Sequence, residues 1–274
     1  MQHVKESIIR SLIRRFSKDE LIGLSAELAY FFLLSLFPFL IFLITLIAFL
    51  PLSQDDLLNF LAQYAPGESI KLIERTLTEI VAGSSGGLLS FGILATLWSA
   101  SNGINAIVRA FNRAYEVEES RSFIVARGMA VLLTVAMVFV ILVALLLPVF
   151  GKELGIFLFS VFGLSDAFLA FWNMARWLVS AVILFIVFTA LYFFAPNKRL
   201  HIKDVFPGAV FATVGWTAVS FAFSYYVSSF GNYSAAYGSL GGIIVLMIWF
   251  YLSGMIIMLG GELNAVLYSR KKQT

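Results

Sequence analysis

The stretch Trp98–Arg113 has the sequence W-S-A-S-N-G-I-N-A-I-V-R-A-F-N-R, an apolar run that contains three asparagines and an arginine before its last residue. On a helix of about 3.6 residues per turn, four polar side chains share one face, the polar stripe: Asn102, Asn105, Arg109 and Asn112. The opposite face carries Ile104, Ile107, Val108 and Phe111. Because lipid hydrocarbon cannot satisfy an amide or a guanidinium, such a stripe in a spanning helix has to face protein or a water-filled cavity. The polar stripe is therefore the leading candidate site.

The composition is that of a membrane protein. Of 274 residues, 60% are hydrophobic and 13% are charged, and the mean hydropathy is +0.92. A soluble domain carries roughly 25% charged residues, about twice as many. The chain has no cysteine, which excludes disulfides, thiolate catalysis and Cys-ligated metals. We therefore predict an all-α, polytopic membrane protein.

Six stretches are long enough to cross an apolar core about 30 Å thick, which takes roughly 20 helical residues. They are residues 24–50, 88–111, 125–150, 174–195, 206–230 and 240–268. Residues 4–18 separate apolar from basic side chains, which predicts an amphipathic helix lying on the membrane surface. Residues 51–87 are predicted to form two short helices over the outer mouth of the bundle. Their inward-facing residues would be Leu57, Leu61, Ile73 and Leu77. The whole chain, 1–274, is expected to be one six-span domain.

The distribution of basic residues predicts the orientation. With both termini in the cytoplasm, fifteen of the nineteen Lys and Arg residues lie on the inner side. This excess fits the positive-inside rule. It also accounts for the basic pI of about 9.1 without nucleic acid as a partner.

Two features concern helix shape and packing. Pro38 lies inside the first span and removes a backbone donor, which predicts a kink near Leu34. That kink is a candidate gate, although a static packing kink is an equally good interpretation. In the fifth span, Gly208, Ala212 and Gly215 share one side, which predicts close approach of a neighbouring helix.

Three ionisable residues are expected at similar depth near the inner ends of their spans. Glu27 follows the start of the first span, and Arg109 and Glu262 precede the ends of the second and sixth. We predict that Arg109 bonds to Glu27, to Glu262 or to both, with Asn105 and Asn264 adding hydrogen bonds. The alternative role of such a cluster is a clamp that fixes helix register.

Three segments together resemble the YihY/BrkB family of bacterial inner-membrane proteins. They are E-L-A-Y-F-F-L-L-S-L-F-P-F-L at Glu27–Leu40, W-S-A-S-N-G-I-N-A-I-V-R-A-F-N-R-A-Y at Trp98–Tyr115, and Y-G-S-L-G-G-I-I-V-L-M-I-W-F-Y-L-S-G-M-I-I-M-L-G-G-E-L-N-A at Tyr237–Ala265. The resemblance implies a six-helix plasma-membrane protein, with suggestions of transport or export and of a role in envelope integrity or virulence. Some members of the family have carried the label ribonuclease BN.

The ribonuclease label conflicts with the residues present. Metal-dependent RNA hydrolysis needs clustered His, Asp or Glu ligands that hold ions and activate water. The two histidines, His3 and His201, lie in basic segments, and no span carries paired carboxylates. The sequence also has no phosphate-binding loop, dinucleotide-binding fingerprint or G-x-S-x-G motif. We therefore predict that the protein is not an enzyme and needs no metal or cofactor.

These observations lead to two hypotheses. In the first, the protein is an inner-membrane transporter, exporter or lipid-handling translocator with a polar cavity that opens to the cytoplasm. The cavity residues would be Glu27, Asn102, Asn105, Arg109, Glu262 and Asn264. In the second, it is a structural or envelope-assembly factor whose polar groups lock the helices together. The expected partners are membrane lipids and an unidentified small-molecule or lipid substrate, and an oligomer is possible.

Overall fold

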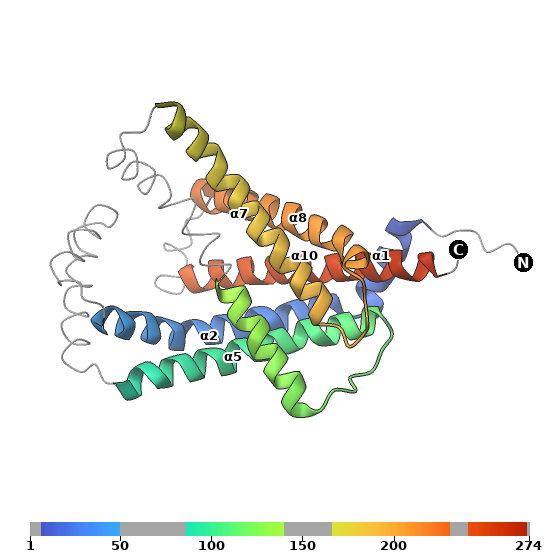
Figure 1. Cartoon of the computed structure of the whole chain (residues 1–274), viewed down its shortest axis with the longest axis horizontal. Coiled ribbons are helices and arrows are strands. Elements are labelled where there is room, and N and C mark those ends of the chain that lie inside the picture. Colours follow the sequence, from blue (N-terminus) through green and yellow to red (C-terminus); the bar gives the residue numbers. More distant parts are fainter. Residues whose placement is uncertain (1–6, 50–85, 140–165, 231–240, 273–274) are drawn as a thin grey trace, which may run out of the picture. The chain divides into compact units, whose positions relative to one another are not determined.

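The computed structural model describes residues 7–49, 86–139, 166–230 and 241–272, and every regular element within these ranges is an α-helix (Figure 1). The helices are α1 (Ile8–Lys18), α2 (Leu21–Phe49), α5 (Gly86–Ala114), Phe123–Phe139, α7 (Asp166–Phe194), α8 (Ile202–Phe230) and α10 (Gly241–Lys271). The predicted all-α class is confirmed for this part of the chain.

Five helices in the described ranges are long and apolar enough to cross a membrane. These spans are Leu21–Phe42, Leu89–Ala114, Trp177–Phe194, Ile202–Val227 and Gly241–Lys271. They correspond to the first, second, fourth, fifth and sixth predicted spans. The predicted third span overlaps the shorter helix Phe123–Phe139, and its remainder lies outside the described residues. A sixth span, cytoplasmic termini and a single six-span domain stay predictions.

The chain forms two compact units. The larger unit comprises residues 1–30 and 101–274, and the smaller comprises residues 31–100. Within the smaller unit, α2 and α5 pack closely at Gly92, where an added Cβ would lie 3.0 Å from the backbone of Phe42. The absence of a side chain at Gly92 therefore allows this close approach. The predicted outer helices fall almost entirely in residues 50–85, outside the described residues.

Helix α2 contains Pro38, the predicted gate. The helix runs without interruption from Leu21 to Phe49, with Pro38 inside it. Proline removes a backbone donor, but a long helix tolerates this loss when its other hydrogen bonds are intact. The kink and its gating role therefore stay predictions.

Helix α1 has the amphipathic form that the sequence predicts. Its first turn is capped by Ser7, whose Oγ accepts a hydrogen bond from the Arg10 backbone at 3.2 Å. Ser11 faces the protein and is buried, whereas Ile9 and Ile13 are exposed. The helix packs against α10 within the larger unit. Its location on a membrane surface stays a prediction.

Helices α8 and α10 approach closely because glycines line their contact. A Cβ added at Gly208 of α8 would collide with the carbonyl oxygen of Gly260 on α10. A Cβ added at Gly260 would collide with the Tyr192 hydroxyl of α7, which donates to the Ile257 carbonyl at 2.8 Å. Ala212, one turn after Gly208, is fully buried. The predicted close packing along this side of the fifth span is therefore confirmed.

This packing predicts a large difference between two glycine-to-alanine substitutions. Gly260→Ala should lower the free energy of unfolding by about 1–3 kcal/mol, because the new methyl group overlaps backbone and a fixed phenol. Gly128→Ala should be neutral or stabilising by up to about 1 kcal/mol, since nothing lies within 4 Å of the added Cβ. Thermal unfolding of both variants in detergent measures the difference, and equal shifts would contradict the packing.

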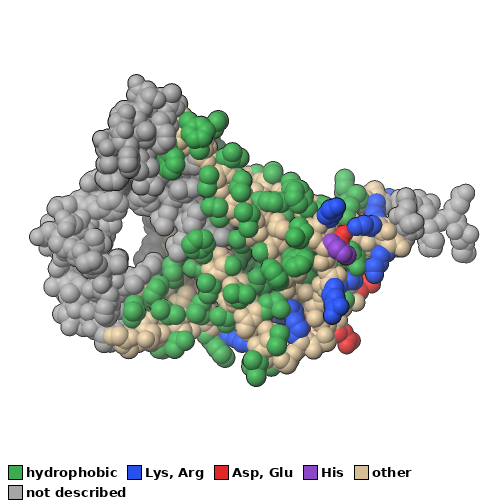
Figure 2. All heavy atoms as spheres, in the orientation of Figure 1, with side chains coloured by type: hydrophobic (Ala, Val, Ile, Leu, Met, Phe, Trp, Pro, Cys, Tyr) green, Lys and Arg blue, Asp and Glu red, His purple; other side chains and the backbone are tan. Residues whose placement is uncertain are grey.

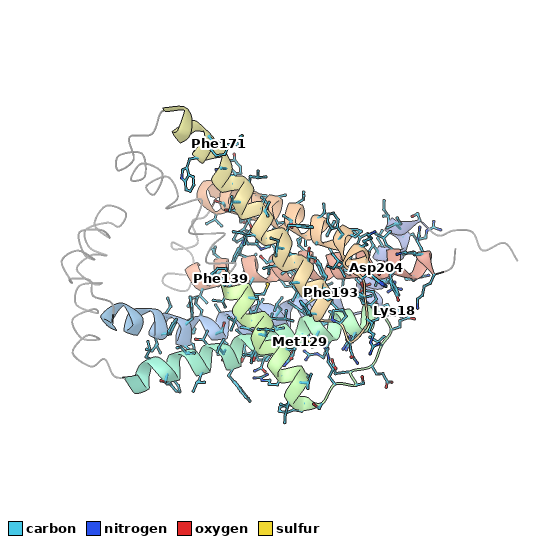
Figure 3. All side chains as sticks on the ribbon, in the orientation of Figure 1. Lys18, Met129, Phe139, Phe171, Phe193 and Asp204 are labelled. Atoms are coloured by element: carbon cyan, nitrogen blue, oxygen red, sulfur yellow. The ribbon has the colours of Figure 1, made fainter. Side chains whose placement is uncertain are left out.

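Basic side chains gather at one end of the larger unit. Figure 2 shows most of the Lys and Arg side chains toward the end where α10 finishes, and mainly hydrophobic side chains among backbone and other atoms over the rest of the visible described surface. Lys18 and Asp204 lie toward this end, and Phe139 and Phe171 lie toward the other (Figure 3). Charges at one end of long apolar helices are typical of a membrane boundary.

Candidate functional site

An ion pair between Arg109 and Glu27 joins α5 to α2 within the larger unit. Nη2 of Arg109 donates to Oε1 of Glu27, as the sequence predicts. Glu27 follows Leu21 by six residues, and Arg109 precedes Ala114 by five, so each lies roughly 8–9 Å inside the end of its span. Even so, 46% of the Arg109 side chain and 36% of the Glu27 side chain are exposed. The pair thus lies within two apolar helices and is open to its surroundings.

Two further pairs continue this line of charge beyond the spans. Arg113 lies one turn after Arg109 and donates to Glu20 at 2.6 Å. Lys18, in the last turn of α1, lies 3.4 Å from Glu116. Exposed pairs of this kind contribute about 0–1 kcal/mol each, so their contribution to stability is small. Their effect is a strongly charged rim around the ends of α1, α2 and α5.

The polar stripe contacts different neighbours along its length. Arg109 faces α2, whereas Asn102 accepts a hydrogen bond from Arg127 of the helix Phe123–Phe139 at 2.7 Å. Asn112 is buried and accepts from the Asn197 backbone at 2.7 Å. The stripe therefore faces protein at these three positions.

The most deeply buried face of α5 is the apolar one. Ile104 and Ile107 are fully buried, and Phe111 is 1% exposed. The Phe111 ring packs 5.2 Å from the Tyr192 ring and occupies the space that a side chain at Gly261 would need. Dispersion contacts stabilise tight apolar packing between helices in a membrane. The apolar face of α5 therefore lies against other helices, and the polar stripe lies beside it.

A polar network that the sequence analysis missed ties two loops together. Arg121 binds Glu119 through two hydrogen bonds of 2.6 and 2.5 Å and donates to the Ala195 carbonyl at 3.0 Å. Asn112 donates to the same carboxylate at 3.0 Å. The hydrogen bonds from Arg121, together with those from Asn112, hold the pKa of Glu119 below its usual value despite partial burial. The network fixes the connection after α5 against the connection after α7.

The lowered pKa of Glu119 predicts an acid-dependent loss of stability. A carboxyl whose pKa is lowered by folding stabilises the protein above its usual pKa of about 4.5, and this stabilisation is lost as the pH falls through the lower value. Glu119→Gln should therefore lower the melting temperature at pH 7 and have less effect at about pH 3. The effect should stay below about 1 kcal/mol, since the carboxylate is partly exposed. Thermal scans at both pH values test this, with Glu118→Gln as the control.

Glu262 does not join the Arg109 cluster, which corrects one alternative of the prediction. Its carboxylate is 1% exposed, and Oε2 lies 3.5 Å from Nη1 of Arg15 on α1. The same Arg15 nitrogen donates to the Ala114 carbonyl at 2.7 Å. The physical reason is that α1 packs on the face of α10 that carries Glu262, whereas Arg109 points toward α2.

Asn264 likewise serves a different contact from the one predicted. It accepts from the Gly208 backbone at 2.6 Å and donates to the Val205 carbonyl at 3.0 Å. The side chain is fully buried between α8 and α10. Asn264 therefore joins these two helices and does not add hydrogen bonds to Arg109. Asn105 remains on the polar stripe and is half-buried.

Tyr115, immediately after α5, is another buried polar residue that the sequence analysis missed. Burial raises the pKa of its phenol well above the usual range, and nearby Asp204, Tyr268 and Glu262 raise it further. The Lys198 ammonium lies 5.4 Å from the Tyr115 ring centre and 4.9 Å from that of Tyr268. Tyr115 therefore keeps its proton at neutral pH next to a group of acidic side chains.

A comparison with known families identifies the family of this chain. Residues 12–274 match the family model described as virulence factor BrkB. The chain belongs to the BrkB family. The resemblance that the sequence predicts is therefore confirmed.

Relatives of this BrkB-family chain carry two kinds of name. It is 60% identical over 266 residues to the putative ribonuclease-like protein YfkH of Bacillus subtilis, and the match covers 97% of each chain. The chain is 29% identical to a UPF0761 membrane protein of Alkalilimnicola ehrlichii, and this match covers 93% of the chain and 57% of that protein. It is 27% identical to one from Alteromonas mediterranea, with 93% and 85% covered. No solved structure matches the chain.

Proposed function

We propose that this BrkB-family protein is an inner-membrane transporter, exporter or lipid-handling translocator whose polar pathway opens to the cytoplasm. One observation supports this above all others, the partial exposure of the Arg109–Glu27 pair inside two apolar spans. A charged pair facing hydrocarbon would be costly, and intramembrane ionisable groups usually line a cavity or a pathway. Arginine can extend its long side chain toward the headgroups, but the shorter Glu27 cannot reach as far.

The pathway that we propose centres on α5. Glu27, Asn105 and Arg109 form its core. Asn102 lies two turns of helix before Arg109 and is further from the charged rim. Glu262 and Asn264, which the sequence placed in the same cavity, fit other roles better. Asn264 is fully engaged between α8 and α10, and Glu262 faces α1. Neither the transported species nor its coupling ion is part of the proposal.

The protein is proposed to lie in the bacterial inner membrane with both termini in the cytoplasm. The support is the excess of basic residues assigned to that side, fifteen of nineteen, and their concentration at one end of the larger unit (Figure 2). Membrane lipids are then the expected partners, and neither nucleic acid nor a catalytic reaction is proposed. An oligomer remains compatible with this placement.

A structural or envelope-assembly role is the second candidate. It is favoured by the Asn264 contacts and by the Arg121–Glu119 network, which hold helices and loops in fixed positions. Interhelical hydrogen bonds in membranes contribute about 0.6–2 kcal/mol each, so such groups stabilise a scaffold without any pathway. The two functions differ in whether water reaches Asn105.

Cysteine labelling separates the two functions, because the native chain has no cysteine. Under the transport proposal, Asn105→Cys should react with a water-soluble thiol reagent at least about tenfold faster than Ala106→Cys, because only a hydrated thiol ionises and reacts readily. Ala106 is fully buried and is the matched control one residue away. Reaction rates in inside-out membrane vesicles give the measurement. Equal protection at both positions would favour the assembly factor.

A further inference from the structure

Two buried carboxyl groups lie together where the turn after α1 meets α10. Asp19 is the residue that caps the end of α1, and it is 6% exposed. Glu262, on α10, is 1% exposed. The Asp19 backbone donates to the Arg15 carbonyl at 2.8 Å, and the Arg15 guanidinium lies 3.5 Å from Glu262, so the two carboxyl groups flank one arginine and interact with each other. Carboxyl groups from two helices thus share one buried site in the larger unit.

The contact between these carboxyl groups lacks a donor. Among the residues that the structure describes, Oδ2 of Asp19 and Oε1 of Glu262 are buried and have no hydrogen-bond partner. An ionised carboxylate only accepts hydrogen bonds, so two of them side by side cannot satisfy each other. Buried polar atoms without a partner are rare in folded proteins. A proton held by one carboxyl group would supply the donor that the other carboxyl group lacks.

The charges around the pair also leave one negative charge uncompensated. From α1, Arg15 contributes one positive charge, 3.5 Å from Oε2 of Glu262. After α5, the neutral Tyr115 hydroxyl is buried and also without a partner in the described part of the chain. From α8, Asp204 acts on Tyr115 and is itself paired with Lys271 at 3.0 Å. Lys198 donates to the Tyr115 carbonyl at 3.2 Å and lies over the Tyr115 and Tyr268 rings. With both carboxyls ionised, Asp19, Glu262 and Arg15 would together carry a net charge of −1, which is strongly unfavourable in a buried site.

We propose that Asp19 and Glu262 form a binding site for one proton, which the two carboxyl groups share. A shared proton turns one carboxyl into a donor to the other and brings the charge of the group with Arg15 to zero. Two adjacent carboxyl groups in a site from which water is excluded favour this state, because they cannot both ionise without strong repulsion. The site goes beyond the transport proposal, since proton binding is a property of the pair whether or not a substrate crosses the membrane.

A proton suits this site better than a metal cation does. Hard metal ions bind through several oxygen ligands, typically about six or more. Here the carboxylate oxygens of two residues are available, and the Arg15 guanidinium next to them would repel a metal ion. A proton needs only one oxygen from each carboxyl group, and the hydrogen bond that it forms gives each group a partner.

Infrared difference spectroscopy of the purified full-length protein in lipid vesicles tests the proposal. Between about pH 5 and pH 9, ordinary exposed carboxyls are ionised, so a protonated carboxylic acid gives a separate C=O band. We expect one such band in the wild type, shifted in D2O and weaker as the pH rises. It should disappear in Glu262→Gln and in Asp19→Asn, because either substitution leaves a single carboxylate compensated by Arg15. Glu116→Gln, an exposed carboxylate paired with Lys18, should retain it.

The result has clear alternatives. A wild type without the band, or a band that persists in both neutral variants, would overturn the proposal. A band that weakens when sodium replaces choline at constant pH would point to a metal cation and would also overturn it. If the neutral variants do not fold, Asp19→Glu and Glu262→Asp decide, because each keeps two carboxyl groups and changes the distance between them. Both should shift the band, and a band unchanged in both would overturn the proposal. Thiol labelling at Asn105 does not enter this experiment, so the transport proposal stands or fails separately.

Discussion

Replacing Arg15 with alanine should destabilise the larger unit severely. Arg15 is the cation that contacts the buried Glu262, and it also donates to the Ala114 carbonyl at the end of α5. Its removal leaves two buried carboxyl groups without a positive charge and leaves the carbonyl without this donor. Breaking a buried ion pair on one side typically costs about 3–5 kcal/mol. The yield of folded protein and its melting temperature in detergent measure the loss.

Two variants show whether the effect comes from the carboxyl groups. Arg10→Ala, on the exposed side of α1, should change stability by less than about 0.5 kcal/mol. Adding Glu262→Gln to Arg15→Ala should recover much of the loss, since the glutamine carries no charge that needs compensation. The double-mutant cycle then gives a coupling energy of about 1–3 kcal/mol. A melting temperature of Arg15→Ala close to the wild type would show that Arg15 does not stabilise this site.

The helices of this protein were predictable because the membrane imposes a strong constraint. Apolar stretches of about 20 residues have few alternatives to a spanning helix. The small residues at Gly208 and Ala212 predicted the close packing of α8, because small side chains allow two helix backbones to approach each other closely. Helix ends were less predictable. Helix α5, for example, continues to Ala114, beyond residue 111.

The polar contacts were predictable only in part, because depth along a helix does not determine which neighbour a side chain faces. Glu27 and Arg109 were paired correctly from their similar depth. The same reasoning failed for Glu262, whose partner comes from α1. The basic residues of α1 were interpreted only as surface charges that set orientation. Arg15 and Asp19 are four residues apart, which places both near one face of that helix. This spacing was the available signal that α1 carries charged residues toward a buried contact.

Reversing the charge of Arg109 should change the reactivity of a cysteine at position 105 by a large factor. The two positions are one turn apart on the polar stripe, so their Cβ atoms lie about 6 Å from each other. Arg109→Glu changes the local charge by two units. Even at the dielectric constant of water, this change alters the Coulomb energy of a singly charged reagent about 6 Å away by about 1.4 kcal/mol. That energy corresponds to roughly a tenfold change in the local concentration of the reagent. In an Asn105→Cys background, Arg109→Glu should therefore slow an anionic thiol reagent and accelerate a cationic one.

The combined exchange of Arg109→Glu with Glu27→Arg separates a pathway from a clamp. The single Arg109→Glu change places two carboxylates together and should lower the melting temperature, whereas the double exchange restores an ion pair and should recover it. In a hydrated pathway, the preference for cationic reagent should remain after this recovery, because the charged residue nearest to the introduced cysteine on the same helix is still a glutamate. In a clamp, the melting temperature should fall and recover in the same way while the cysteine stays unreactive toward both reagents. Recovery of stability together with a lasting inversion of reagent preference is therefore the result that the transport proposal requires.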